Sequence, residues 1–424
     1  MVSNNSADIL ETVFGNLSRK NFPAWDILDI AGQNDFIYIT PDYQLLGQGE
    51  FETLEASLND DDDTSAILRR LKEINSQVDI PEILPGQFFI SPSTLCFFPA
   101  KYDIALSSVV FIPKRLIYLQ NNGSGWQLCL NCEPVNFDEL QSNPIDNKIK
   151  NPDTFKLTST MDHEIFKESV AEILNEISDG KVTKVVLARR VEIEANRPFC
   201  KITSLNRLKT LYPTCTIFSM DGFLGASPEL LIKKSADTIT LKPLAGTIAS
   251  SGNLLADKVA IDELMASKKN RNEHSLVVEW LKVKLSSICN SLEVSDVPDI
   301  VTLRNVIHLA TPISAKLDSS EDSILSLVAK IHPTPAVGGI PDSSYMLYQE
   351  KYEIFDRGRY AGPVGWLNSA GDGEFYLGIR SAQISNSEAT IWAGVGIVEN
   401  SDPELELIET QLKLQAMLSC LVRP

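Results

Sequence analysis

The sequence predicts an α+β protein in which a large, mostly antiparallel β-sheet sandwich carries helices on its outside. Short runs of β-branched and aromatic residues, separated by turn residues, recur along the 424-residue chain and are typical of antiparallel strands. Several longer stretches instead space their apolar residues at the period of a helix. No internal repeat or low-complexity tract is present, which argues against a solenoid or a propeller.

The first 150 residues contain mostly predicted strands. Asn122-Gly123 is a strong signal for a two-residue hairpin between apolar runs. The aspartates at 60–63 are expected to form a solvated loop before a helix. The polar residues 141–153 mark the best internal boundary, which gives an N-terminal sub-region at 1–150 and a catalytic region at 155–424 of the same fold. The elements expected in the sub-region are strands at 36–39, 107–113, 116–119 and 126–130 and a helix that contains 66–74.

The rest of the chain alternates helices and strands. Its helices are predicted from apolar residues that recur every three or four positions, and its last strands form a meander with a turn at 370–373. The expected helices are 163–177, a long amphipathic one at 264–292, a short one at 324–331 and a closing one at 404–421. The expected strands are 184–191, 215–218, 229–233, 238–241, 362–367, 374–383 and 389–398.

The composition excludes several classes of protein. A net charge of −18 disfavours nucleic-acid binding, which needs clustered Lys and Arg. No apolar stretch is long enough to span a membrane, and residues 1–15 lack the features of a signal peptide. Seven scattered cysteines predict reduced thiols and a cytoplasmic protein. Cys129 and Cys132 form a CxxC pair, but without further ligands nearby we interpret it as part of a strand pair.

The closing helix and the strand before it carry the first candidate site. Glu406, Glu409 and Lys413 are three and four residues apart, so they share one helix face. Gly394 and Gly396 precede them, and two such glycines let backbone N–H groups approach an anion. Each feature alone is more often a solvated face or a strand bulge. Together they suggest an anion held by the backbone and a cation held by carboxylates.

Three further residues gain interest from this context, although each alone is more often a surface or strand-end residue. Glu273 and Glu409 would suffice for a hard divalent cation such as Mg²⁺, which needs only one or two carboxylates. Burial of Lys184 at the start of an apolar strand would lower its pKa and allow it to act as a base. Glu229, just before another apolar strand, could be held protonated and act as an acid.

Eight motifs occur in one order across about residues 160–420. They are KVVLARR, FLGASPELL, KPLAGT, NRNEHS, HPTPAVGG, RYAGPVGW, GIRSAQI and AGVGIVENSDPELELIETQLK. In this order they resemble the chorismate-utilising enzymes, a family that includes isochorismate, salicylate, anthranilate and aminodeoxychorismate synthases. The resemblance implies the chorismate-utilising enzyme fold, while the first 150 residues carry little of it.

The resemblance also implies a role for each candidate residue. Lys184 matches the general base that activates water, and Glu229 matches the general acid that protonates the departing 4-hydroxyl. Glu273 and Glu409 match Mg²⁺ ligands, with Glu406 acting through water. The other candidates match substrate contacts: Gly394, Gly396 and Lys413 at the ring carboxylate, with His308 close by; Tyr360 and Arg380 at the enolpyruvyl carboxylate; Gly246 and Thr247 along the ring; and Thr334 as a weaker candidate.

The implied activity is that of an isochorismate synthase, which uses Mg²⁺ to convert chorismate reversibly into isochorismate for a siderophore or menaquinone pathway. HPTPAVGG resembles the isochorismate and salicylate branch. Ala245 stands where aminodeoxychorismate synthases often have Lys, so water is the expected nucleophile. Asn270 departs from the acidic residue that other branches place three positions before the metal-binding Glu.

Three alternatives remain open from the sequence. A salicylate synthase would carry isochorismate onward by losing pyruvate, and an ammonia-using synthase would pair with a glutaminase subunit. A chorismate-binding protein without turnover is the third. We expect chorismate as the small-molecule partner and a monomer without a glutaminase subunit, a nucleic acid or a membrane.

Overall fold

The computed structural model describes residues 12–17, 26–78, 90, 93–135, 152–319 and 322–422. The strands before residue 151 are β1 (Thr12–Leu17), β2 (Phe36–Ile39), β3 (Tyr43–Ala56), β4 (Leu95–Pro99), β5 (Ser108–Gln120) and β6 (Gly125–Leu130). The helices of this part are the 3-10 helix η1 (Ile27–Asp29) and α1 (Asp61–Asn75).

The part after residue 151 holds the remaining elements. Its helices are α3 (His163–Ser178), α4 (Lys201–Leu211), α5 (Leu254–Ala266), α6 (Lys268–Ser286), α7 (Ile324–Ile331), α8 (Tyr345–Tyr352) and α9 (Pro403–Leu421). Its strands are β7 (Phe155–Ser159), β8 (Lys184–Ala195), β9 (Thr216–Met220), β10 (Phe223–Ser227), β11 (Leu230–Ser235), β12 (Thr238–Lys242), β13 (Leu244–Ala249), β14 (Cys289–Val294), β15 (Asp299–Thr302), β16 (Val306–Ala310), β17 (Ile313–Leu317), β18 (Gly339–Ile340), β19 (Pro363–Asn368), β20 (Gly373–Leu377), β21 (Ser381–Ser385) and β22 (Glu388–Ile397).

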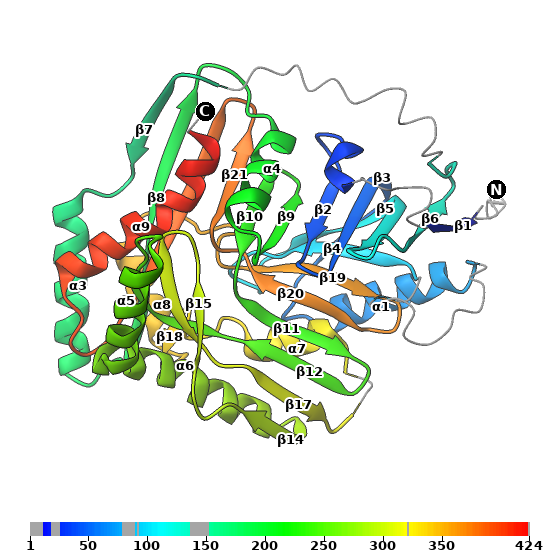
Figure 1. Ribbon diagram of the computed structural model, residues 1–424. Helices are drawn as coiled ribbons and strands as arrows, with labels where there is room; N and C mark the ends of the chain where they lie inside the picture. Colours follow the sequence, from blue (N-terminus) through cyan, green and yellow to red (C-terminus); the bar gives the residue numbers. More distant parts are fainter. Residues whose placement is uncertain are drawn as a thin grey trace, which may run out of the picture.

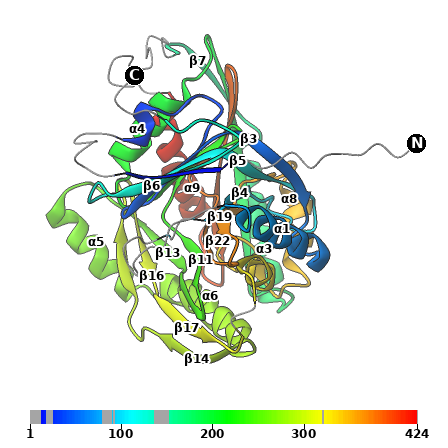
Figure 2. The same cartoon turned by 90° about the vertical axis from the view of Figure 1, so that its right-hand side faces the viewer.

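The strands of the described residues pair antiparallel, and nineteen of them join into one sheet. The strands β13, β16 and β15 form a second, smaller sheet. Helices cover the outside: in Figure 1, α3 and α9 lie along β8, while α1 lies among the N-terminal strands. Figure 2 shows α5 on the far side of the molecule from α1. The predicted α+β class is therefore confirmed.

The N-terminal strands share the sheet and the core of the later strands. β2 pairs with β9, and β4 pairs with β19. The rings of Phe98 and Phe375 meet edge to face with centroids 6.5 Å apart, and the Tyr38 hydroxyl donates to the Glu374 carboxylate. The boundary at residue 150 stays a prediction, because most of the proposed linker at 141–153 lies outside the described residues.

Many elements agree with the sequence prediction to within a few residues, including the hairpin of β5 and β6, where Gly123 has a φ of 81°. Cys129 lies in β6 with Cys132 just beyond it, and all seven cysteines are free thiols, as expected. No helix within the described ranges is long and apolar enough to cross a membrane.

The helix predicted at 264–292 is wrong. The chain forms α5, α6 and β14 there instead. Ser267 separates the two helices with an extended backbone (φ −64°, ψ 116°), and its hydroxyl accepts a hydrogen bond from the amide of Asn270. This side chain satisfies an amide that has no partner inside α6, so it stabilises a new helix start. In the sequence, such a serine looks like any polar residue on a helix face.

The strand predicted at 374–383 is also wrong, because β20 ends before Arg380 and β21 begins after it. Arg380 has a φ of 51°, in the left-handed region that residues with side chains rarely adopt. The backbone therefore turns at Arg380. A residue held in this region points to a functional constraint.

Two smaller predictions near the N-terminus need correction. The aspartates at 60–63 are not a loop: Asp60 caps α1, and the other three form its first turn, where negative charge is favourable. The runs at 107–113 and 116–119 are one strand, β5. Pro113 lies inside it, opposite an irregularity of β3 near Glu50, where the absence of an amide N–H is tolerated.

Candidate active site

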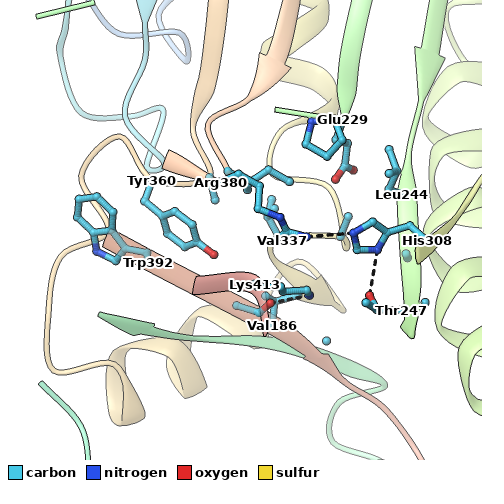
Figure 3. A pocket seen from close by; sticks show the side chains of 18 of the residues that line it. Val186, Glu229, Leu244, Thr247, His308, Val337, Tyr360, Arg380, Trp392 and Lys413 are labelled. Carbon is cyan, nitrogen blue, oxygen red and sulfur yellow. Dashed lines mark hydrogen bonds between the residues drawn. The ribbon is translucent and has the colours of Figure 1, made fainter. Parts of the chain in front are cut away.

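A cavity lies between β8, β13, β16 and β22, and ten of the predicted residues line it (Figure 3). In the figure, the Glu229 carboxyl, the Tyr360 hydroxyl and the Arg380 guanidinium point into the same space from different elements. The ten lining residues are Glu229, Gly246, Thr247, Glu273, His308, Tyr360, Arg380, Gly394, Gly396 and Lys413.

Four predicted residues do not line this cavity. Lys184 lies just behind it, and Glu406 and Glu409 line an adjoining cavity that shares Thr247 with the first. Thr334 is buried, and its carbonyl accepts the amides of residues 337 and 338 in a turn. Thr334 therefore shapes the loop behind the wall, and its role as a substrate contact stays a prediction.

Lys184 begins β8 and is completely buried. Its Nζ donates to Oε1 of Glu273 at 3.3 Å, so it reaches the cavity wall through that carboxylate. Burial lowers the pKa of Lys184, and the nearby Glu273 opposes this shift. Gly396 makes room for the pair, because a Cβ there would lie only 2.7 Å from Cε of Lys184. The shift has the direction expected from burial, and its main counter-charge is Glu273.

Glu229 lies at the other side of the cavity and is only 3% exposed. Burial raises its pKa to about 7, against hydrogen bonding from the Leu244 backbone and the positive charge of Lys184. The group is therefore protonated for part of the time at neutral pH. A carboxyl in this state can donate a proton to a leaving group.

Gly394 and Gly396 direct their amide groups away from β8. In the ladder, Gly394 faces Ala188 and Gly396 faces Val186. The amides of these two β8 residues point away from β22: that of Ala188 donates to Glu353, and that of Val186 donates to the carbonyl of Gly338. Amides of facing residues in an antiparallel ladder point both inward or both outward. The N–H groups of the two glycines thus point toward the free edge of β22, on the side of the cavity.

Lys413 on α9 also faces this edge. Its Nζ donates to the carbonyl of Gly394 at 2.8 Å and forms an ion pair with Oε1 of Glu409 at 2.6 Å. Burial raises the pKa of Glu409, but Lys413 and Lys269 outweigh this effect and hold it below its usual range. A cationic and amide-rich corner therefore lies beside an ionised carboxylate.

A hydrogen-bonded chain joins Arg380 to Glu409. Nη2 of Arg380 lies 3.0 Å from Nε2 of His308, and Nδ1 of His308 lies 3.0 Å from the Thr247 hydroxyl. Arg380 can only donate, so Nε2 accepts and Nδ1 carries the proton that is donated to Thr247. Burial and Arg380 both lower the pKa of His308, which agrees with a neutral ring. The Thr247 hydroxyl in turn donates to Glu409.

Two supporting residues, Glu353 and Arg357, were not predicted from the sequence. Arg357 lines the cavity, donates to the carbonyls of Val337 and Val186, and lies over the ring of Tyr102. Its Nε also donates to Glu353 at 2.8 Å. The spacing of four residues between an acid and a base was the available signal, but such pairs are common on solvated helices.

Glu273, Glu406 and Glu409 approach each other from α6 and α9. Within the described ranges, no three acidic, His or Cys side chains form a group that could hold a metal ion as they stand. Burial, with Glu409, raises the pKa of Glu406 to about 7, and its Oε2 is buried without a hydrogen-bond partner. This orphaned oxygen and the convergence of hard oxygen ligands fit a divalent cation.

Comparison with known proteins identifies the family of this chain. The family model of chorismate binding enzymes matches residues 117–422. The salicylate biosynthesis isochorismate synthase of Pseudomonas aeruginosa is 37% identical over 270 residues, which cover 62% of this chain and 56% of that protein. The isochorismate synthase MenF of Bacillus subtilis is 37% identical over 265 residues, with the same 62% and 56% coverage. The matched region thus spans little more than half the length of these relatives.

The fold also has a solved counterpart. The structure of MenF, the menaquinone-specific isochorismate synthase from Escherichia coli, superimposes with a TM-score of 0.80 at 23% identity, covering 98% of this chain and 95% of that one. The family model matches well over half of the sequence and includes every predicted site residue. The chain therefore belongs to the chorismate-binding enzyme family.

Proposed function

We propose that the protein is an isochorismate synthase, which converts chorismate reversibly into isochorismate. The observation that carries the proposal is the buried pair of Lys184 and Glu229 around one cavity. Burial lowers the pKa of the lysine and raises that of the carboxyl to about 7, so both pKa values move toward neutral pH. Titratable groups whose environments are tuned in this way mark acid and base assignments. The names of the relatives at 37% identity support the same activity.

The reaction exchanges one hydroxyl for another. Neutral Lys184 takes a proton from water, and the water oxygen forms a bond to ring carbon 2 while both ring double bonds move by one position. The bond from carbon 4 to its hydroxyl breaks, and Glu229 gives this hydroxyl a proton, so that water leaves. One water enters and one leaves, so the product is an isomer of the substrate, and reversal exchanges the two proton-transfer roles.

Two cationic groups suit the two carboxylates of chorismate. Arg380 beside Tyr360 would hold the enolpyruvyl carboxylate, since a guanidinium can bind a carboxylate with two parallel hydrogen bonds. The outward amides of Gly394 and Gly396, with Lys413, would hold the ring carboxylate. The locally positive pocket explains how an acidic protein can take a dianionic substrate.

Mg²⁺ is the proposed cofactor, held by Glu273 and Glu409 with Glu406 close by. When bound, it would supply positive charge that neutralises the ring carboxylate and fixes its position. Glu273 also pairs with Lys184, so the metal and base sites share a wall. The cytoplasmic location, the monomeric state and the lack of a glutaminase subunit remain predictions that accompany this proposal.

The nucleophile is expected to be water. Ala245 lines the cavity and supplies only a methyl group where an amine could otherwise attack the ring. The test is incubation of the purified chain with chorismate and Mg²⁺, with products separated by chromatography. Accumulation of isochorismate without salicylate is the expected result. Salicylate and pyruvate formed without a second enzyme would contradict the proposal in favour of a salicylate synthase.

A further inference from the structure

The carboxylates assigned to the metal are already neutralised by lysines. Each one is paired by a hydrogen bond or an ion pair with the amino group of its own lysine. The pairs are Glu273 with Lys184 at 3.3 Å, Glu406 with Lys269 at 2.8 Å and Glu409 with Lys413 at 2.6 Å. A divalent cation can therefore bind these oxygens only if at least one ammonium group moves away.

Two of the three lysines are held in place. Lys184 is completely buried at the start of β8, and Lys413 also donates to the carbonyl of Gly394. The side chain of Lys269 is 21% exposed and lines the adjoining cavity between β13, α6 and α9. Lys269 is thus the lysine with space into which its ammonium group can move.

Lys269 also occupies the place that a bridging cation needs. Its Nζ lies 2.8 Å from Oε1 of Glu406 and 3.6 Å from Oε2 of Glu273, so one ammonium joins α6 to α9. It leaves Oε2 of Glu406 buried and unsatisfied. An ammonium has only three donors, whereas a divalent cation such as Mg²⁺ can coordinate six oxygens and carries twice the charge.

We propose that Lys269 is a resident counter-ion, which bridges the carboxylates of α6 and α9 in the metal-free protein and is displaced into the adjoining cavity when a divalent cation binds. This inference rests on the proposed function and deepens it, because it names a residue that sets the cation affinity of the same site. The displaced ammonium stays near the site, so it acts as an internal competitor for the carboxylates.

Calorimetric titration of the full chain with MgCl₂, in the absence of chorismate, tests the displacement. Lys269→Met keeps the length of the side chain and removes the competitor, so it should bind Mg²⁺ about tenfold more tightly than the parent, the factor expected for one lost charge-assisted hydrogen bond. Lys268→Met is the matched control, because Lys268 is the exposed neighbour on the same helix. It should bind Mg²⁺ like the parent.

Lys269→Arg keeps the competing charge and should bind Mg²⁺ no more tightly than the parent. Thermal unfolding gives a second measurement. Without Mg²⁺, Lys269→Met should melt below the parent, because Glu406 and Glu273 lose their counter-ion. When Mg²⁺ is added, the melting temperature of Lys269→Met should rise by more than that of the parent. Equal or weaker Mg²⁺ binding by a folded Lys269→Met variant overturns the displacement.

Turnover of chorismate by the parent separates this inference from the proposed function. If the parent forms isochorismate with Mg²⁺ while Lys269→Met binds the ion no more tightly, only the displacement is overturned. If neither protein binds Mg²⁺, the displacement and the metal assignment fail together. If Lys269→Met binds more tightly but the parent does not turn over chorismate, the displacement is supported and the proposed function fails.

Discussion

The Glu353–Arg357 pair and the carboxylate–lysine cluster of α6 and α9 are both buried, but only in the former does every charged-group nitrogen and oxygen have a hydrogen-bond partner. Arg357 donates from Nε, Nη1 and Nη2, and Glu353 accepts with both oxygens, including the amide of Ala188. In the cluster, one oxygen of Glu406 has no partner. The first arrangement is complete without a ligand, whereas the second has room for one.

This difference identifies the Glu353–Arg357 pair as a structural support and the carboxylate–lysine cluster as part of the reactive site. A buried charge without full compensation is costly, so it persists where the fold or a ligand offsets the cost. Arg357 and Glu353 fix the backbone of β8 and of the loop around Val337, which form cavity walls. The cluster and the Lys184–Glu229 pair lie on or just behind those walls, with pKa values shifted by burial. Substitutions in the cluster or the Lys184–Glu229 pair should therefore lower activity, whereas substitutions in the Glu353–Arg357 pair should lower stability.

The largest expected effect is a loss of turnover when the proposed base is removed. Lys184→Ala should lower kcat for isochorismate formation by about 10²–10⁴-fold, the usual cost of removing a general base. Chorismate binding should survive, because Arg380 and Lys413 remain. Kinetics and calorimetric binding of chorismate to the variant check both statements. Full activity would refute the base assignment, and loss of binding would make Lys184 a binding residue.

The next largest effect is a loss of stability when the Glu353–Arg357 pair is removed. Arg357→Met leaves Glu353 buried and unpaired, which should lower the free energy of unfolding by about 3–5 kcal/mol. Arg359→Met is the control, since Arg359 pairs with the exposed Asp221 and should change stability by about 1 kcal/mol or less. Urea denaturation measures both. Equal stability of the two variants would show that the saturated pair is not a scaffold.

A smaller effect is expected for Arg380, which lines the cavity and is proposed to bind the substrate. Arg380→Lys keeps the charge but loses the planar fork and its contact with His308. We expect kcat/KM to fall about tenfold or more, corresponding to a lost charge-assisted hydrogen bond of roughly 1.5–3 kcal/mol. Steady-state kinetics with chorismate gives the value. An unchanged kcat/KM would place the substrate carboxylate elsewhere.

The sequence predicted the site better than it predicted the local backbone. The family resemblance assigned Glu229, His308 and Arg380 to one site, and the structure brings the three residues to one cavity. The break at Ser267 and the turn at Arg380 were missed, since each depends on one residue's backbone conformation rather than on an apolar period.

Lys269 was missed for another reason. Its carboxylate partner Glu406 lies on α9, far along the chain, so no spacing in the sequence links the two residues. Its other partner, Glu273, is four residues away on α6, but that pair resembles an ordinary helix-surface ion pair. Only the folded structure, in which Lys269 bridges Glu273 of α6 and Glu406 of α9, identifies it as a counter-ion of the candidate metal site.

The pH dependence of kcat for isochorismate formation tests the central claim most directly. The leaving hydroxyl needs a proton from Glu229, whose pKa is raised to about 7 mainly by burial. Glu229 must be protonated and Lys184 must be neutral for the reaction, so kcat should follow a bell-shaped dependence on pH. Glu229→Gln cannot donate this proton and should have little activity at any pH. A kcat that does not depend on pH, together with near-normal turnover by Glu229→Gln, would contradict the account.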